Sequence, residues 1–370
     1  MIVGVLKEPA YESRVSLLAE SAAVLVKRKL DVWVESSAGE KAFCPDPAYS
    51  SAGVRLVPRA EILASADLLL GIRHDDIPSG LQNKIVIGIY QPLYNVEKMA
   101  QWAGQQLTSF SLDMLPRTTR AQNMDVLSSQ ASIAGYKAVL VAANTFPRYF
   151  PMFMTAAGSV PPAKVLILGA GVAGLQAIAT ARRLGAVVEV FDTRPSVKEE
   201  VMSLGGKFIE VEGAADASGA GGYAVEQSAA FQQRQQEKIA ASIARADIVI
   251  TTAQIPGKQA PQLVTAAMIE AMRPGSVIVD LAAATGGNTE LTKNNTTQIH
   301  GGITIIGDSN LAATLPYDAS KLYGRNVLNF LQLIIDAEGK PNLNFDDDLV
   351  KGCCITHNGS IVNPKIKAEQ

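Results

Sequence analysis

Three glycines and one carboxylate are the residues in this sequence whose spacing most clearly indicates chemistry. The stretch "VLILGAGVAGLQAIATARRLGAVVEVFDTRP" places Gly169, Gly171 and Gly174 directly after one apolar run and Asp192 at the end of the next. The first glycine permits a tight turn, the second lets a pyrophosphate approach the backbone, and the third lets a helix pack close to a strand. Phosphates then lie at a helix N-terminus, where N–H groups favour an anion. The pattern predicts a dinucleotide-binding site.

Asp192 indicates which dinucleotide binds. A carboxylate at the end of the second strand accepts hydrogen bonds from both ribose hydroxyls and repels a 2′-phosphate, which selects NAD over NADP. Arg194, two residues later, is of the type that binds the phosphate of NADP, so NADP stays an alternative. Because Pro195 makes a fixed turn, we expect Arg194 to point to solvent and we favour NAD.

A group that handles protons is harder to find in this sequence. Oxidation of an alcohol or an amine requires a side chain that manages the proton of the heteroatom. The histidines are His74, His300 and His357, and only His74, in "GIRHDD", follows a predicted strand end. A surface loop is the plainer interpretation of that histidine.

A second polar stretch, "LPRTTRAQNMDVLSSQ" at 115–130, has two interpretations. Arg117, Gln122, Asp125 and Ser128 are candidates to face a nicotinamide, and the last three are spaced by three residues, on one helix face or its approach. The alternative is an ordinary capped helix with Thr118 or Thr119 at the N-cap. The residues alone leave both open.

Composition and charge limit the class of protein. The 370 residues are 48% hydrophobic and 18% charged, which is typical of a buried α/β protein rather than a disordered one. A net charge of -2, without a block of like charges, argues against a nucleic-acid partner. Cys44, Cys353 and Cys354 offer neither a disulfide framework nor metal-ligand spacing, so we predict a reduced compartment and no metal site. No secretory signal or membrane span is evident, which predicts a soluble intracellular chain.

Strands and helices alternate along the chain, as in βαβ units with parallel sheets. We expect a helix at 17–30, a long helix at 121–145 that bridges two domains, and helices at 172–184 and 320–339. The expected strands are 1–8, 31–37, 66–73, 83–90, 164–168, 187–191, 207–211, 247–252, 276–281 and 302–310.

These elements predict an α/β fold with two Rossmann-like, doubly wound parallel-sheet domains. The first domain is discontinuous, at 1–125 plus 315–370, and the NAD-binding domain at 126–314 is inserted into it. The segment 211–238 is too long and too rich in glycine for an ordinary connection. We expect a mobile loop near 212–228 with Tyr223 at its tip, which closes over the nucleotide. A solvent-exposed insertion is the alternative.

Five blocks of the sequence, in order, resemble one known family. The chain is similar over nearly its whole length to the soluble NAD(H)-binding component of proton-translocating nicotinamide nucleotide transhydrogenases, the first domain of the alpha subunit. The fold of that component is shared with alanine dehydrogenase, whose opening resembles "KEPAYESRVSL". The blocks are "RAQNMDVLSSQASIAGYKAV", "AAGSVPPAKVLILGAGVAGLQAIATARRLGA", "FDTRPSVKEEVMSLGGKFIEV", "TTAQIPGKQAPQLVT" and "GSVIVDLAAATGGN".

The resemblance implies functional residues. The family's Arg-Gln-Asp loop corresponds to Arg117, Gln122 and Asp125, its following serine to Ser128, and its mobile-loop tyrosine to Tyr223. The ribose-binding acid corresponds to Asp192. The resulting cofactor-binding set is Gly169, Ala170, Gly171, Val172, Ala173, Gly174, Asp192, Thr193, Arg194, Tyr223, Thr252, Ala253 and Gln254.

The resemblance also implies partners. We expect a homodimer that associates with an NADP(H)-binding component and a membrane-spanning component. The chain would be peripheral on the cytoplasmic face of the membrane through these partners, without inserting into the membrane itself. Proton translocation would belong to the assembled complex.

A missing catalytic group distinguishes this sequence from the amino-acid dehydrogenases of the same fold. Alanine dehydrogenases carry a catalytic histidine where this chain has Gln91, and a substrate-binding lysine where it has Arg73. Hydride transfer between two nicotinamides moves no heteroatom proton, so it requires positioning rather than a base. The sequence shows one dinucleotide fingerprint, which places NADP(H) on another chain. The alternatives are an NAD-dependent alanine dehydrogenase and a non-catalytic NAD sensor.

Overall fold

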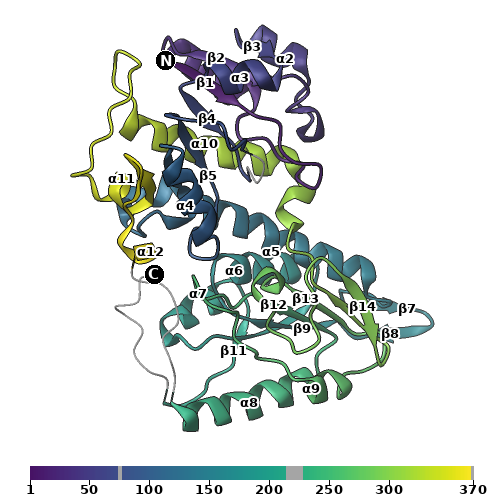
Figure 1. The fold of residues 1–370 in the computed structure, drawn as a ribbon. Helices are drawn as coiled ribbons and strands as arrows, with labels where there is room; N and C mark the ends of the chain where they lie inside the picture. Colours follow the sequence, from purple (N-terminus) through teal and green to yellow (C-terminus); the bar gives the residue numbers. More distant parts are fainter. Residues whose placement is uncertain (74–76, 214–227, 368–370) are drawn as a thin grey trace. The chain divides into compact units, whose positions relative to one another are not determined.

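The computed structural model describes residues 1–73, 77–213 and 228–367. The chain divides into two compact units, unit 1 at Met1–Gln130 with Ala313–Gln370 and unit 2 at Ala131–Ala312 (Figure 1). The predicted α/β class, with one parallel-sheet domain inserted into another, is confirmed. His74 and Tyr223, and most of the loop predicted near 212–228, lie outside the described residues.

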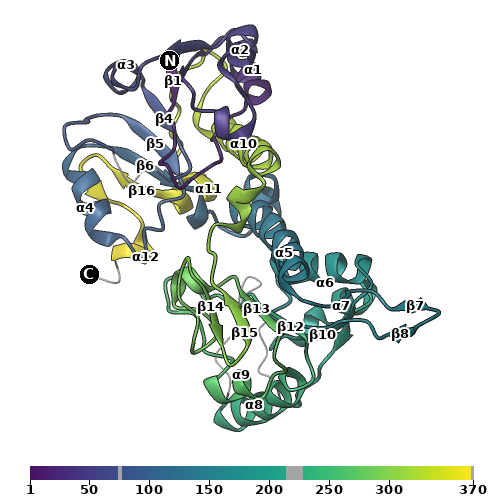
Figure 2. The ribbon, with the colours of Figure 1, turned by 90° about the vertical axis from the view of Figure 1, so that its right-hand side faces the viewer.

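Unit 1 contains one sheet, in the order β17-β16-β6-β5-β4-β1-β2-β3. The six strands from β3 to β6 are parallel, whereas β16 and β17, from the returning segment, are antiparallel (Figure 2). The central strand β4 is buried at every residue, as expected when helices cover both faces of a parallel sheet. The strands are β1 Ile2–Val5, β2 Asp31–Glu35, β3 Arg55–Val57, β4 Leu68–Leu70, β5 Ile85–Gly88, β6 Thr108–Ser111, β16 Cys354–His357 and β17 Ser360–Ile361.

The helix α10 of the returning segment packs into the core of unit 1. Its buried residues Tyr323, Val327, Phe330 and Ile334 recur every three or four positions, so they form one apolar stripe. The helices of this unit are α1 Ala19–Lys27, α2 Asp46–Ser51, α3 Arg59–Ser65, α4 Val96–Gly104, α10 Pro316–Ile334, α11 Asp348–Cys353 and α12 Pro364–Lys367, with 3₁₀ turns η1 Glu40–Ala42, η2 Leu112–Met114, η3 Thr119–Met124 and η6 Leu311–Thr314 at the junction.

Unit 2 has a second sheet with helices on both faces, in the order β11-β10-β9-β12-β13-β15-β14. Along β9, Val165 and Ile167 point to a core shared with α5, α6 and α7, and the alternate residues point to a core shared with α8 and α9. The strands are β9 Lys164–Leu168, β10 Val187–Phe191, β11 Lys207–Phe208, β12 Ile248–Thr251, β13 Val277–Asp280, β14 Thr297–His300 and β15 Ile303–Ile306. The helices are α5 Val126–Thr145, which begins in unit 1, α6 Val172–Arg183, α7 Lys198–Ser203, α8 Ala229–Ile243 and α9 Ala266–Glu270, with η4 Pro195–Val197 and η5 Ala283–Thr285.

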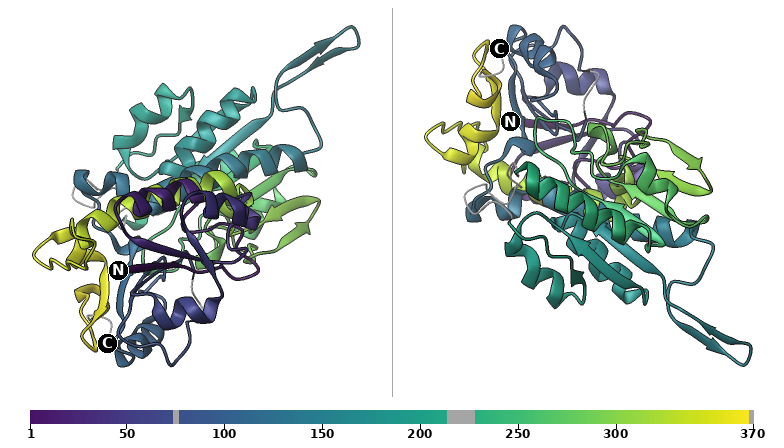
Figure 3. Two further views of the ribbon diagram at one scale, coloured as in Figure 1. Left: turned by 90° about the horizontal axis from the view of Figure 1, so that it is seen from above. Right: turned by 90° about the horizontal axis from the view of Figure 1, so that it is seen from below.

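A hairpin that the sequence pattern did not predict projects from unit 2. Its strands are β7 Phe153–Thr155 and β8 Gly158–Val160, which pair only with each other. Both views in Figure 3 show it extending away from the sheet of its own unit.

The long helix α5 begins later than the sequence predicted. Residues Thr119–Met124 form a 3₁₀ helix, and α5 starts at Val126. The Asp125 carboxylate accepts hydrogen bonds from the Ser128 backbone N–H (2.9 Å) and hydroxyl (2.6 Å). Asp125 is therefore the N-cap, and the assignment of Thr118 or Thr119 to that position was wrong.

Among the described helices, α5 alone is long and apolar enough to span a membrane. Its composition has another explanation, because Ala138, Val139 and Ala142 are buried in a core of unit 2. Gly135 also lies so close to α6 that a Cβ there would stand 2.1 Å from the Ala173 carbonyl oxygen. The apolar face of α5 thus packs against protein.

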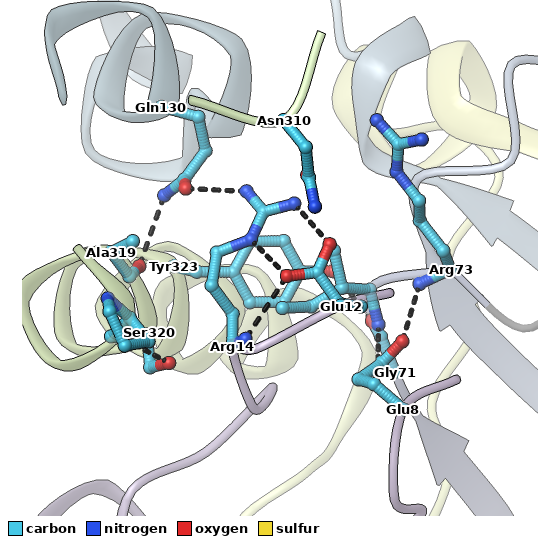
Figure 4. Close-up of polar contacts among 12 residues, drawn as sticks. Glu8, Glu12, Arg14, Gly71, Arg73, Gln130, Asn310, Ala319, Ser320 and Tyr323 are labelled. Carbon is cyan, nitrogen blue, oxygen red and sulfur yellow. Dashed lines mark hydrogen bonds and ion pairs between the residues drawn. The ribbon is translucent and has the colours of Figure 1, made fainter. Parts of the chain in front are cut away.

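A buried ion pair joins the distant segments of unit 1 (Figure 4). The Arg14 guanidinium donates from Nε and Nη2 to the two carboxylate oxygens of Glu12, at 2.8 and 2.6 Å. Its Nη1 donates to Gln130 Oε1 at 2.7 Å, and Gln130 Nε2 donates to the Ala319 carbonyl on α10 at 3.1 Å. Both members of the pair are buried. The chain before the insertion and the chain after it are therefore hydrogen-bonded through one arginine and one amide.

The Glu12–Arg14 pair should contribute strongly to stability. Glu12→Gln leaves a buried guanidinium without its counter-ion, and we expect a loss of about 3 kcal/mol in the free energy of unfolding. The matched control is Glu61→Gln, which breaks the exposed pair with Arg55 (57% and 39% exposed) and should cost under about 1 kcal/mol. Urea unfolding at pH 7 measures both, and equal losses would contradict the prediction.

The same pair predicts a pH dependence of stability. Burial raises the pKa of Glu12, but the hydrogen bonds and charge of Arg14 outweigh it, so the pKa is lowered overall. The stabilisation is therefore complete above the unfolded-state pKa of about 4.3 and is lost as the pH falls through the lower folded-state pKa. The difference in stability between the wild type and Glu12→Gln should shrink in that acid range.

Candidate dinucleotide-binding site

The glycine turn between β9 and α6 is closely packed on one side and open on the other. Gly169 has φ +107°, and a Cβ there would stand 2.4 Å from Thr252 Oγ1. A Cβ on Gly174 would stand 1.9 Å from the Gly169 carbonyl oxygen, so the helix lies directly on the turn. At Gly171, by contrast, a Cβ would meet no atom within 4 Å. The turn therefore leaves room at the start of α6, where no described side chain caps the helix and an anion is favoured.

The Asp192 carboxylate lies beside this turn and is bound to Arg194. Its Oδ2 accepts the Ala170 backbone N–H at 2.7 Å and Arg194 Nη2 at 2.7 Å. Its Oδ1 accepts the Arg194 backbone N–H at 2.8 Å and Nε at 2.9 Å. The hydrogen bond from Asp192 raises the pKa of Arg194. The expectation that Arg194 points to solvent was wrong, since its side chain is 15% exposed and folds back onto the acid.

A hollow of about 110 Å³ adjoins the same carboxylate. Its walls include Asp192, Thr193, Pro195, Phe208, Val211 and Phe231. One end is therefore polar and the other apolar, a combination that suits a ribose joined to an aromatic base.

The loop after β12, which contains Thr252, Ala253 and Gln254, is held by residues that sequence reasoning missed. Thr252 Oγ1 donates to the Gly169 carbonyl at 3.0 Å. The buried Asn288 amide accepts from the Ala253 N–H at 3.0 Å and donates to its carbonyl at 2.8 Å. Asp280, at the end of β13, in turn accepts from the Asn288 N–H at 2.7 Å. An acid ending an apolar run was a signal for Asp280, whereas no local pattern marks Asn288.

The polar stretch at 115–130 belongs to unit 1. The structure joins Asp125 to Ser128 by the capping hydrogen bonds. Gln122 lies on the 3₁₀ approach to the helix, and both Gln122 and Arg117 are exposed. The stretch thus combines the two interpretations drawn from the sequence, because a capping acid and exposed polar side chains occur together.

The remaining candidate groups have partners within their own units. His300 Nε2 lies 3.4 Å from a Glu270 carboxylate oxygen, and His357 Nδ1 lies 3.1 Å from Thr108 Oγ1. Burial raises the pKa of Cys354 to about 12 and that of Cys353 well above its usual value, so both thiols stay protonated. In the described ranges, no three His, Cys, Asp or Glu side chains are grouped to hold a metal ion.

Arg14, in the stretch that resembles the opening of alanine dehydrogenase, is also committed. Its guanidinium is taken up by Glu12 and Gln130. Gln91, which stands where those enzymes carry a histidine, is exposed and has φ +48°. Its carbonyl accepts hydrogen bonds from the Asn95 N–H and side-chain amide, which fixes the turn before α4.

Comparison with known proteins places both units in one family. The model of the alanine dehydrogenase/PNT N-terminal domain matches residues 4–134, and that of the C-terminal domain matches residues 138–364. The chain is 43% identical to an NAD(P) transhydrogenase alpha subunit of Rickettsia prowazekii, over 98% of this chain and 96% of the relative.

Solved structures agree with this placement. A transhydrogenase from Sinorhizobium meliloti superposes with a TM-score of 0.89 at 44% identity, over 98% of this chain and all of the other. An L-alanine dehydrogenase superposes with a TM-score of 0.82 at 24% identity, over 100% of this chain and 98% of the other, which shows a shared fold.

The glycine turn predicts opposite effects for two substitutions. Gly174→Ala forces a Cβ into the Gly169 carbonyl, and we expect a loss of about 1–3 kcal/mol in the free energy of unfolding. Gly171→Ala meets open space at φ -77° and should change stability by less than about 0.5 kcal/mol. Urea unfolding of the two variants tests this, and similar losses at both positions would contradict the packing described here.

Proposed function

The chain belongs to the alanine dehydrogenase/PNT family, and we propose that it is the NAD(H)-binding component of a proton-translocating NAD(P) transhydrogenase. The observation that carries the proposal is the open glycine turn at the start of α6 beside the Asp192 carboxylate. The similarity to transhydrogenase alpha subunits over the whole chain supports the choice within the family.

In this proposal the residues of unit 2 hold the nucleotide. The backbone of 169–174, with Ala170, Val172 and Ala173, receives the pyrophosphate at the helix N-terminus. Asp192 accepts the hydroxyls of the adenosine ribose, with Thr193 and Arg194 beside it. The hollow next to Asp192 receives the adenine. The loop at 252–254 and Tyr223 contact the remainder of the bound NADH.

The nicotinamide is positioned rather than chemically activated. Arg117, Gln122, Asp125 and Ser128 orient it, and the bound dihydronicotinamide supplies a hydride to NADP⁺ held by a partner component. Since no heteroatom is protonated or deprotonated, a general base is not required. The contribution of the protein is to fix distance and angle between two rings. Proton translocation would occur in the full complex, to which this chain is attached peripherally on the cytoplasmic face of the membrane.

The test is to mix the chain with an NADP(H)-binding component and follow hydride transfer from NADH to thio-NADP⁺ by absorbance. We expect transfer in the mixture, and no NADH formation when L-alanine and NAD⁺ are supplied. NADH formation from alanine would favour the dehydrogenase alternative. Tight NADH binding without transfer would favour a sensor.

Asp125→Ala separates positioning from stability. The variant loses the α5 cap, at a cost of about 1 kcal/mol, and should lower the transfer rate by roughly 100-fold because the nicotinamide is misplaced. The control is Thr265→Ala, which removes the N-cap hydrogen bond of α9 to the Met268 N–H and should leave transfer unchanged. Equal rates for the two variants would exclude Asp125 from a role in positioning.

We further propose that the β7–β8 hairpin forms the contact of a homodimer. Tyr149, Met152, Phe153 and Met154 are exposed around it, and the Tyr149 and Phe153 rings stack at 4.9 Å. Such a cluster of exposed apolar side chains is typical of a protein–protein contact.

The hairpin proposal predicts a change of oligomeric state. The double substitution Phe153→Asp and Met154→Asp should convert a dimer to a monomer in analytical ultracentrifugation, because charge would be buried in the contact. Ile299→Asp, at a site 74% exposed on β14, is the matched control and should remain dimeric. A doubly substituted chain that stays dimeric would place the interface elsewhere.

A further inference from the structure

Arg194 occupies the acceptor sites that a ribose would need. A carboxylate offers roughly four acceptor positions. Asp192 accepts from two backbone N–H groups, of Ala170 and Arg194, and from Nε and Nη2 of the Arg194 side chain. The carboxylate is 6% exposed, so little of it remains for another donor.

The two kinds of donor differ in how readily they can be replaced. The Ala170 N–H belongs to the glycine turn, and the Arg194 N–H lies two residues from the acid in the chain, so both are fixed by the local backbone. The guanidinium reaches Asp192 through a flexible side chain and can leave without moving the backbone. A ribose diol donating two O–H groups must therefore take the positions of Nε and Nη2.

We propose that Arg194 is an affinity-determining residue of this site, a latch that closes on Asp192 in the free protein and must open before the adenosine ribose binds. The inference rests on the proposed function, since it assumes that the bound molecule is NAD(H). The bonds that are lost involve two charges, and those that replace them involve one, so opening is unfavourable. The apparent dissociation constant is then larger than the intrinsic one by the inverse of the open fraction.

The latch distinguishes ligands by their adenosine half. NADH carries the ribose diol that competes with Arg194. Reduced nicotinamide mononucleotide (NMNH) lacks it and does not require the latch to open. Removal of the guanidinium should therefore affect one nucleotide and not the other.

The experiment compares Arg194→Met with the wild-type chain by calorimetric titration of NADH and of NMNH. We expect roughly three- to tenfold tighter NADH binding in the variant, with the NMNH affinity unchanged. In an Asp192→Asn background, where the charged acceptor is gone, Arg194→Met should give no such gain. Arg194→Lys keeps the charge but loses the paired geometry, so it should give a smaller gain, and it serves as the test variant if Arg194→Met does not fold.

Unchanged or weaker NADH binding in Arg194→Met, while the wild type binds normally, would overturn the latch and leave the proposed function standing. A gain that appears equally for NMNH, or that persists in the Asp192→Asn background, would overturn it as well. Failure of the wild-type chain to bind either nucleotide would overturn the proposed function and the latch together.

Discussion

The hydrogen-bonded chain from Glu12 through Arg14 and Gln130 to α10 is the interaction on which unit 1 depends. The sequence leaves this unit after Gln130 and returns at Ala313, so its two segments form one core although a whole unit separates them in the chain. Hydrophobic contacts such as those of Phe330 supply most of the packing energy but little direction. A buried, fully satisfied guanidinium has a fixed geometry, and it therefore fixes how the returning helix docks. The cost of desolvating the charges makes this arrangement sensitive to the loss of either partner.

In unit 2, carboxylates at the ends of parallel strands organise the loops. Asp192 follows β10 and holds the Ala170 N–H of the glycine turn. Asp280 ends β13 and accepts from the backbone of Ala282 and Asn288, which in turn holds the loop after β12. Backbone N–H groups at these positions have no ladder partner, and an acid that follows a buried strand can satisfy several of them. The loops at this edge of the sheet are thus preorganised by acids.

The sequence predicted what depends on local pattern. The glycine spacing, the alternating apolar runs and the acid after β10 were sufficient for the fold class and the position of the turn. The start of α5 was missed because a 3₁₀ segment and a helix share composition, and only the Asp125–Ser128 hydrogen bonds separate them. The orientation of Arg194 depended on a choice between solvent and a neighbouring carboxylate that spacing does not encode. Asn288 and the β7–β8 hairpin depend on contacts between segments, or on an exposed surface, and neither leaves a periodic signal.

A competitor in the adenosine half of a nucleotide site has a particular kinetic consequence. Arg194 and the nicotinamide-positioning residues act at opposite ends of an extended molecule in this proposal. Interactions with the adenosine ribose are the same before and during hydride transfer, so weakening them changes affinity without changing the barrier to transfer. A component that must take up one nucleotide and release its oxidised form in every cycle is slowed when binding is too tight, because release then limits turnover. An internal arginine that competes for Asp192 lowers affinity at the end of the site where the transfer geometry is not affected.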